Sequence, residues 1–189
     1  MFFVVGMLGF SGVAVAGEIT ASWWSRLGLH DLNDAPVSAK GRWVVMVFIS
    51  PECPVANASI PVLNALAAEF APAGFDFVGV YADPTLELPV LKRHTADYHL
   101  GFATVDDRAQ RLVHLGGATY TPETLVFSRD GALLYRGRID DRVTDFGASR
   151  PAATHQDLRD VLCALAAGKP VPFASRPGFG CSIPEVAKR

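Results

Sequence analysis

Residues 44–57, VVMVFISPECPVAN, decide the fold of this chain. The segment from Trp43 to Ser50 lacks polar alternation and is rich in Val and Ile, which is typical of a strand buried on both faces, as in a parallel sheet. A turn follows, and Pro54 fits the first position of a helix, where its missing N–H costs nothing. Cys53 therefore lies at a helix start, where main-chain N–H groups and the helix dipole stabilise a thiolate.

This position favours chemistry over structure, because a structural cysteine is more often found inside a strand or a helix. As a thiolate, Cys53 would attack a disulfide or a peroxide and give a mixed disulfide or a sulfenic acid. The neighbouring Glu52 opposes thiolate formation, although an exposed carboxylate contributes little. We therefore interpret Cys53 as a redox-active nucleophile.

Length and composition limit the number of domains, the kinds of partner and the number of disulfides that the chain can have. A chain of 189 residues suits one domain with a well-buried core, and a net charge of −2 provides no basic field for nucleic acid. Three cysteines, Cys53, Cys163 and Cys181, are too few for a disulfide scaffold but enough for one redox pair and a spare.

The N-terminal segment is nearly uninterrupted in its apolar character from Phe2 to Ala16 and ends in Ala14-Val15-Ala16-Gly17, a small-x-small sequence of the kind that signal peptidase cuts. It is short for a membrane span. We predict a signal peptide over 1–16, atypical because it lacks a positive n-region, and hence export to the periplasm with no stable membrane span in the mature chain. A misassigned start, or a buried or membrane-associated N-terminal segment, is the alternative.

The remaining pattern predicts an N-terminal extension over 17–36, a domain over 37–169 and an irregular tail over 170–189. Within the domain the expected helices are one from Pro54 to about Ala71 bent at Pro61, one over 86–99 cut early by Pro89, one over 108–115 and a last one ending at Gly168. The expected strands are 75–81, a short one at 102–105, and 123–127, which a turn at 129–131 joins to its hairpin partner 132–139. A polar loop is expected over 140–153. Thr154 with Asp157 resembles a capping box for that last helix.

In this order the elements resemble the thioredoxin fold. Cys53 falls on the nucleophilic cysteine, Pro61 on the proline of the active-site helix, and Pro122 on the cis-proline that faces the thiol. More narrowly, five segments resemble an exported bacterial redoxin family related to the alkyl hydroperoxide reductase/thiol-specific antioxidant group: ECPVAN (52–57), TPE (121–123), YRGRIDDR (135–142), HQDL (155–158) and GCSI (180–183).

Several residues of this chain differ from the thioredoxin and peroxiredoxin motifs, and these differences limit the reactions expected of Cys53. Ala56 stands where thioredoxin has its resolving cysteine, and Val47 replaces its buried acid. Of the peroxiredoxin motif only Ser50 and Cys53 fit, because Met46 replaces the proline and Pro122 stands in place of the peroxide-polarising arginine. The resemblance therefore implies a thiol-disulfide or slow thiol-dependent role rather than a fast peroxidase.

The resemblance also implies the substrate side of the site. A cis Pro122 would hold the Thr121 backbone against the sulfur and offer an incoming chain a strand-like edge, and we expect Ser50 and Pro54 to complete this surface. An ordinary trans turn at Pro122 is the alternative.

The other two cysteines have different expected roles. Cys181 could be a resolving thiol, because a Pro/Gly-rich tail can reach back across the sheet end and close a disulfide with Cys53, or it could be a free or intermolecular cysteine. Cys163 follows Leu162 within the apolar face of the last helix, which predicts burial as a small hydrophobe.

Two further groups of polar residues have open roles. The charged run from Arg136 to Arg142 could be a solvated ion-pair cluster, which we favour slightly, or a recognition rim near the thiol. His94 and His99 could be surface residues or could join Cys53 in a copper site, but copper chaperones of this fold use two cysteines close together, so we predict no metal.

We therefore predict an α/β, thioredoxin-like fold with a central mixed sheet flanked by helices. The predicted function is a thiol-dependent oxidoreductase with Cys53 as nucleophile, Cys181 as resolver and no cofactor, which acts on a protein thiol or disulfide or on a peroxide with an unidentified electron donor. The alternative function is a redox-silent module that docks a partner through the Pro122 edge.

Overall fold

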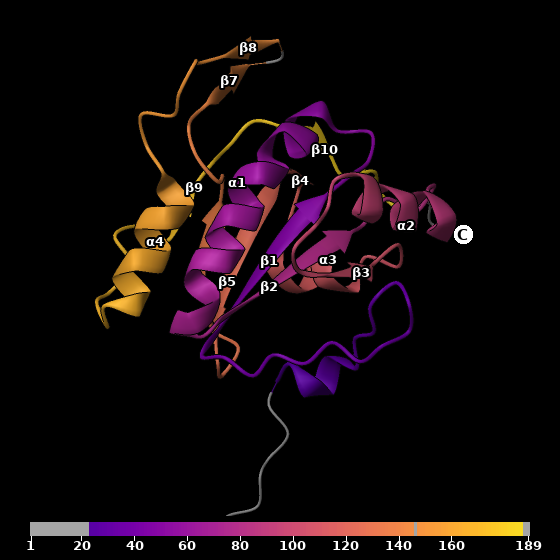
Figure 1. Ribbon diagram of the computed structural model, residues 1–189, viewed down its shortest axis with the longest axis horizontal. Helices are drawn as coiled ribbons and strands as arrows, with labels where there is room; N and C mark the ends of the chain where they lie inside the picture. The colour runs from indigo at the N-terminus through magenta and orange to yellow at the C-terminus, as the bar shows by residue number, and fades with distance from the viewer. Residues whose placement is uncertain (1–22, 146, 187–189) are drawn as a thin grey trace, which may run out of the picture.

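The segment that decides the fold forms the central strand of a six-stranded mixed sheet. The computed structural model describes residues 23–145 and 147–186. The strand order is β3-β2-β1-β5-β6-β9 (Figure 1). The strands are β1 (Trp43–Ile49), β2 (Phe75–Tyr81), β3 (Ala103–Asp106), β5 (Glu123–Ser128), β6 (Leu133–Gly137) and β9 (Ser175–Arg176). β1, β2 and β3 run parallel, whereas β5 is antiparallel to both β1 and β6.

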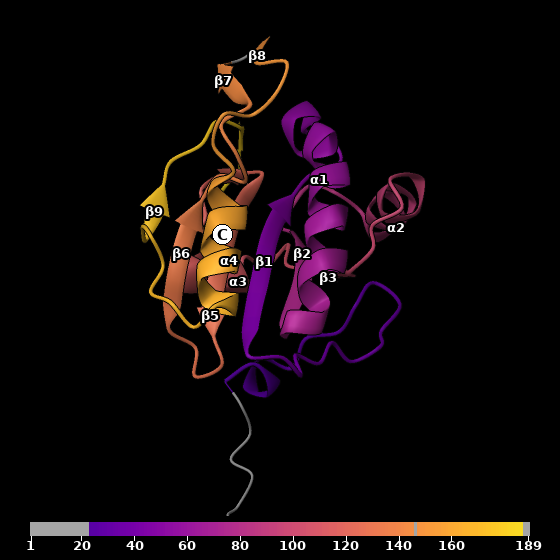
Figure 2. The ribbon, with the colours of Figure 1, turned by 60° about the vertical axis from the view of Figure 1, so that its left-hand side comes forward.

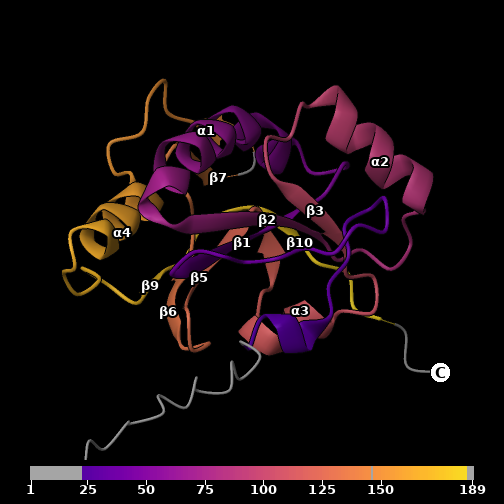
Figure 3. The same cartoon turned by 60° about the horizontal axis from the view of Figure 1, so that its bottom comes forward.

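Helices cover both faces of this sheet, with α1, α2 and α4 on one face and the short α3 on the other (Figure 3). The helices are α1 (Pro54–Phe70), α2 (Leu88–Asp97), α3 (Arg111–Gly116) and α4 (Asp157–Ala166), with 3-10 turns at Ser25–Leu27 and Ala71–Ala73. This arrangement is the predicted thioredoxin-like fold. Pro61 lies inside α1, as the sequence predicts.

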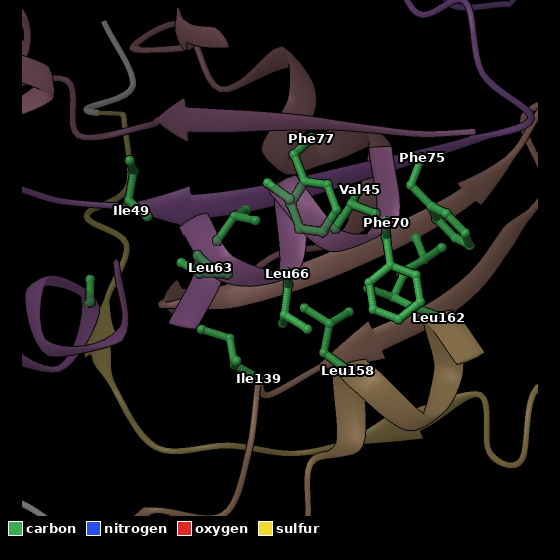
Figure 4. Packing of buried hydrophobic residues seen from close by; sticks show 14 of the residues in the cluster. Val45, Ile49, Leu63, Leu66, Phe70, Phe75, Phe77, Ile139, Leu158 and Leu162 are labelled. Atoms are coloured by element: carbon green, nitrogen blue, oxygen red, sulfur yellow. The ribbon is translucent and has the colours of Figure 1, made fainter. Parts of the chain in front are cut away.

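Two hydrophobic clusters, one on each face, hold the layers together. All seven residues of β1 are buried, which explains its missing polar alternation. Alternate β1 side chains point to opposite faces, so that Val45 packs with α1 and α4 (Figure 4) while Met46 packs with the α3 side. Trp24 and Leu32, from the predicted N-terminal extension, are buried in these clusters as well.

The C-terminal tail is more regular than predicted. β9 pairs in parallel with β6 and so forms the last strand of the main sheet (Figure 2). Further along, β10 (Cys181–Ser182) pairs antiparallel with β4 (Tyr120–Thr121). The polar loop 140–153 also contains a small hairpin, β7 (Val143–Asp145) with β8 (Ala148–Ser149), which projects from the body. Such short strands are held by main-chain hydrogen bonds and leave no hydrophobic period in the sequence, so the sequence does not predict them.

Two predicted helix starts are wrong. Pro89 does not cut α2 but occupies its first turn, the position where a missing N–H is tolerated. α3 begins at Arg111 rather than Arg108, because the buried Asp107 carboxylate accepts hydrogen bonds from the Leu112 and Val113 amides at 2.9 and 3.1 Å and thereby fixes the first turn.

The predicted capping box and the predicted burial of Cys163 are also wrong. α4 begins at Asp157 after Gln156, and no side chain caps it. Thr154 instead bonds Asp141, and Asp157 bonds Arg138. Cys163 is exposed, because the buried stripe of α4 consists of Leu158, Val161, Leu162 and Leu165, and one residue after Leu162 the helix has turned by 100°.

The predicted signal peptide, residues 1–16, lies outside the described residues, and the predicted domain boundaries stay a prediction. Among the described residues, no helix has both the length and the apolar character that crossing a membrane requires.

Candidate redox site

Cys53 is held at the junction of β1 and α1. Its backbone is extended, with φ −95° and ψ 106°, and it is the N-cap of α1. The Ala56 amide donates to its Sγ at 3.4 Å, and the Sγ lies 3.1 Å from the main-chain oxygen of Thr121. The side chain is fully buried. The sulfur therefore sits where an α-helix offers unpaired N–H groups, as predicted.

Thr121 reaches the sulfur because the chain turns sharply after it. The Thr121–Pro122 peptide bond is cis, as the resemblance implies, and it joins β4 to β5. The next residue, Glu123, is buried; it accepts a 2.7 Å hydrogen bond from the Thr119 amide, and Arg136 approaches it at 3.4 Å. Glu123 thus ties the two sides of this turn together.

The tail brings Cys181 to the same place. Cys181 lies opposite Thr121 in the β4–β10 ladder, and it lines the same small cavity as Cys53. The approach of the two chains is close, since a Cβ on Gly180 would lie 2.1 Å from the Thr121 oxygen. Glycine is therefore required immediately before Cys181.

The two thiols have opposite acid–base character. Burial raises the pKa of Cys53, but hydrogen bonds from the side chains of Cys181 and Thr121 and from the amides of Ala56 and Cys181 outweigh it and lower this pKa. Burial, the hydrogen bond with Cys53 and the charge on Cys53 raise the pKa of Cys181 to about 12. Of the two thiols, Cys53 is therefore the more acidic.

A small cavity of about 200 Å³ opens beside the two sulfurs. Its walls are apolar at Ile49, Ala82 and Ile183, and polar at Ser50, Glu52 and Asp83. Cys53, Cys181, Thr121, Ser182 and Pro184 complete the lining.

Of the predicted substrate-side residues, Ser50 and Thr121 line this cavity, whereas Pro54 and Pro122 do not. The Ser50 hydroxyl accepts a hydrogen bond from the Glu52 amide at 3.2 Å and so shapes the turn before Cys53. Within residues 23–145 and 147–186, no three His, Cys, Asp or Glu side chains form a group that could hold a metal ion.

A partly buried polar network that the sequence does not predict supports the turn before Cys53. Asn57 donates to the Pro51 oxygen at 2.9 Å, and its Oδ1 lies 2.8 Å from His94 Nε2. The other ring nitrogen of His94 lies 2.7 Å from the Tyr81 hydroxyl. His94 is buried, so the surface position considered for it is wrong. Asn57 follows Cys53 by four residues, one helical turn, which is the sequence signal that could have identified it.

The charged run that begins at the end of β6 forms ion pairs, as the sequence favours slightly, but the carboxylates are buried rather than solvated. Arg138 bonds the buried Asp157 at 2.6 Å, and Arg176 approaches the same carboxylate at 3.7 Å. Asp141 is also buried, and hydrogen bonds from Thr154 and His155 hold the pKa of its carboxyl well below the usual range. The cluster joins β6, α4 and the tail.

Comparison with known proteins gives a family match. The sequence profile of the AhpC/TSA family matches residues 27–136. No curated protein matches the chain.

Solved structures resemble the chain over most of its length. An uncharacterized conserved protein from Geobacillus kaustophilus has a TM-score of 0.74 and 27% identity, over 86% of this chain and 89% of its own. A hypothetical protein from Sinorhizobium meliloti 1021 has a TM-score of 0.72 and 25% identity, over 85% and 91%. A secreted Mycobacterium tuberculosis disulfide oxidoreductase homologous to E. coli DsbE has a TM-score of 0.53 and 22% identity, over 75% and 98%, and supports the fold alone.

Proposed function

The chain belongs to the AhpC/TSA family, and on that premise we propose that it is a thiol-dependent oxidoreductase with Cys53 as nucleophile and Cys181 as resolving thiol. The observation that carries the proposal is the placement of the two cysteines at one cavity, 128 residues apart in sequence numbering (181 − 53) and brought together by the β4–β10 ladder, in which Cys181 lies opposite the Thr121 whose main-chain oxygen is 3.1 Å from Cys53 Sγ.

With a disulfide substrate, the Cys53 thiolate attacks one sulfur and releases the other as a thiolate, which leaves a mixed disulfide on Cys53. The charge on Cys53 is then gone, and with it one cause of the raised pKa of Cys181. Cys181 passes its proton to the substrate thiolate released first and attacks the Cys53 sulfur, which displaces the second substrate thiolate. Two electrons pass from the cysteine pair to the substrate, and a Cys53–Cys181 disulfide remains.

A hydroperoxide would follow the same path more slowly. The thiolate attacks the terminal oxygen, and with one proton gives a sulfenic acid and an alcohol or water. The Cys181 thiol then condenses with the sulfenic acid, releases water and forms the same disulfide. An external dithiol returns the pair to its reduced form in either case.

The test is disulfide mapping by mass spectrometry under non-reducing conditions after treatment with bis(2-hydroxyethyl) disulfide. We expect a Cys53–Cys181 bond in the native chain, a stable mixed disulfide on Cys53 in Cys181→Ser, and no change from Cys163→Ser, which alters an exposed cysteine on α4. Absence of an adduct on Cys53, or an unchanged disulfide at Cys181 in Cys53→Ser, would contradict the proposal.

The redox-silent binding module has no observation in its favour. It needs the main-chain edge at Thr121 to be free for a partner, and in the described chain β10 occupies that edge.

A further inference from the structure

The main-chain edge beside Cys53 is filled by the chain's own tail. A second polypeptide could approach the sulfur by adding a strand to Tyr120–Thr121, since peptide recognition at a free strand edge uses these main-chain groups. That edge already pairs with Cys181–Ser182, and the Ile183 amide continues the ladder by donating to the Thr119 oxygen at 3.0 Å.

Side-chain contacts also hold the tail in place. Ile183 packs against the hydrophobic cluster on the α3 side of the sheet. The Gln110 amide donates to the main-chain oxygens of Ala82 and Pro184, at 3.0 and 2.5 Å respectively. The tail is thus built into the site over several consecutive residues rather than lying loosely across it.

With the tail docked, Cys53 is fully buried, and it lines a small cavity beside the tail. Its volume of about 200 Å³ lies below the roughly 300–1,000 Å³ of pockets for drug-sized ligands, so it fits a molecule of a few heavy atoms. The Glu52 and Asp83 carboxylates lie on its wall and disfavour an anion there.

We infer that the first oxidant of Cys53 is a small uncharged molecule, and that the tail strand excludes extended polypeptides from the sulfur until it is displaced. This inference rests on the proposed function and adds a substrate class to it. With a small disulfide RSSR, Cys53 takes one RS group and releases one RS⁻, and Cys181 then displaces the second RS⁻. The electrons come from the two cysteines, as above.

The test compares two disulfides with the same small half. One is bis(2-hydroxyethyl) disulfide, and the other is an extended peptide whose single cysteine is joined to 2-mercaptoethanol. The measured quantity is the ratio of their second-order rate constants with reduced protein, each divided by its rate constant with free cysteine. In the native chain we expect the small disulfide to react faster by about tenfold or more, since displacing a few main-chain hydrogen bonds costs at least that factor.

Gly180→Val should release the tail, because its Cβ would collide with the Thr121 oxygen while Cys181 is retained. We expect this variant to lower the small-to-peptide ratio by about tenfold. Ile183→Ser, which removes a side chain that packs on the sheet and also lines the cavity, is a milder variant and should shift the ratio in the same direction. Lys169→Ala, at an exposed position where the tail begins, is the matched control and should leave the ratio unchanged.

The outcomes separate the inference from the proposed function. If neither disulfide reacts with Cys53, the proposed function itself fails. If the native chain reacts equally with both, or if Gly180→Val and Ile183→Ser fold and leave the ratio as it was, the oxidoreductase remains and the tail has no role in selecting its oxidant.

Discussion

At the scale of single residues, the reactivity of Cys53 depends on a neighbour that is remote in the chain. The helix start supplies one hydrogen bond, from Ala56, but the largest favourable contribution to the lowered pKa comes from the Cys181 side chain. In the proposed function, the nucleophile and its resolving thiol therefore influence each other's pKa before any substrate arrives.

Cys181→Ala should consequently raise the pKa of Cys53, whereas Cys181→Ser, which keeps a hydroxyl donor, should raise it less. The physical reason is that burial then acts on the Cys53 thiolate with one fewer hydrogen bond to offset it. The measurement is a pH titration of the thiolate ultraviolet absorbance in a Cys163→Ser background. An identical titration curve for the native, Ala and Ser proteins would show that Cys181 does not set the ionisation of Cys53.

Glu52 should act on charged oxidants more than on neutral ones. Glu52→Gln removes a carboxylate from the cavity wall and with it a repulsion of the anionic disulfide dithiodiglycolate. Exposed charge interactions contribute about 0.2–1 kcal/mol, so we expect the rate with dithiodiglycolate at low salt to rise roughly 1.5- to 5-fold. The rate with bis(2-hydroxyethyl) disulfide corrects for any change in the Cys53 thiolate itself. Asp160→Asn, an exposed acid on α4, is the control; an equal gain from it would assign the effect to net charge.

At the scale of elements, a chain of partly buried hydrogen bonds connects α2 and β2 to the turn before Cys53. Asn57 of α1 holds the Pro51 oxygen, and His94 of α2 holds Asn57. Because Asn57 donates to Pro51, its Oδ1 accepts from His94 Nε2–H, and the Tyr81 hydroxyl then donates to Nδ1. The neutral form of His94 satisfies every partner in this network.

Asn57→Ala should lower the free energy of unfolding by about 1–3 kcal/mol, because a buried His94 nitrogen and the Pro51 oxygen each lose their partner. Asn64→Ala removes a similar side chain of α1, one that bonds His99 and Gly101 at the surface, and should cost less. Guanidinium unfolding of the two variants makes the comparison. Equal losses would mean that the network carries no special share of the stability.

His94 should also give the fold a dependence on pH. Burial lowers its pKa, and the nearby Asp97 only partly opposes this shift. The unfolded chain then binds the proton more readily than the folded chain, so stability is complete above the unfolded value of 6.5 and falls as the pH decreases below it. Unfolding curves between neutral and mildly acidic pH should show this loss in the native chain and a weaker one in His94→Gln, and an unchanged slope in the variant would contradict it.

The sequence predicts the elements that have a clear hydrophobic pattern, but it does not predict those held only by main-chain hydrogen bonds. β1 and the Cys53 helix start are predicted correctly because a continuous apolar run followed by Ser-Pro-Glu-Cys-Pro permits few alternatives. The β4–β10 ladder is missed because two residues of pairing have no period, and its signal is the lone Gly180 before Cys181. Burial of Cys163 is predicted wrongly because a neighbour of a core residue on a helix need not share its face.

At the scale of the whole molecule, the tail beyond α4 has two separate structural roles. β9 extends the sheet beyond β6, and Phe173 packs edge-on against the buried Tyr135, with ring centroids 5.9 Å apart. Arg176, at the end of β9, reaches the buried Asp157 carboxylate. The chain then continues to β10, which pairs with β4 (Figure 1). The first role concerns stability, and the second concerns access to Cys53.

Two shortened chains should separate these roles. A chain that ends after Pro177 keeps β9 and loses β10, whereas a chain that ends after Lys169 loses both and leaves the β6 edge unpaired. The shorter chain should be less stable than the longer one by about 2–4 kcal/mol, from the lost burial of Phe173 and the lost β6–β9 hydrogen bonds. It should also self-associate as its concentration rises, because an exposed strand edge pairs with other chains.

Guanidinium unfolding and light scattering over a range of concentrations measure both effects, with the full chain as the reference. The chain ending after Pro177 should show the association state of the full chain, since a freed edge of two residues in β4 is too short to pair stably with another chain. Identical unfolding midpoints for the two shortened chains would mean that β9 adds nothing to the sheet. Stability would then reside entirely in the segment before Lys169, and the tail would act only at the redox site.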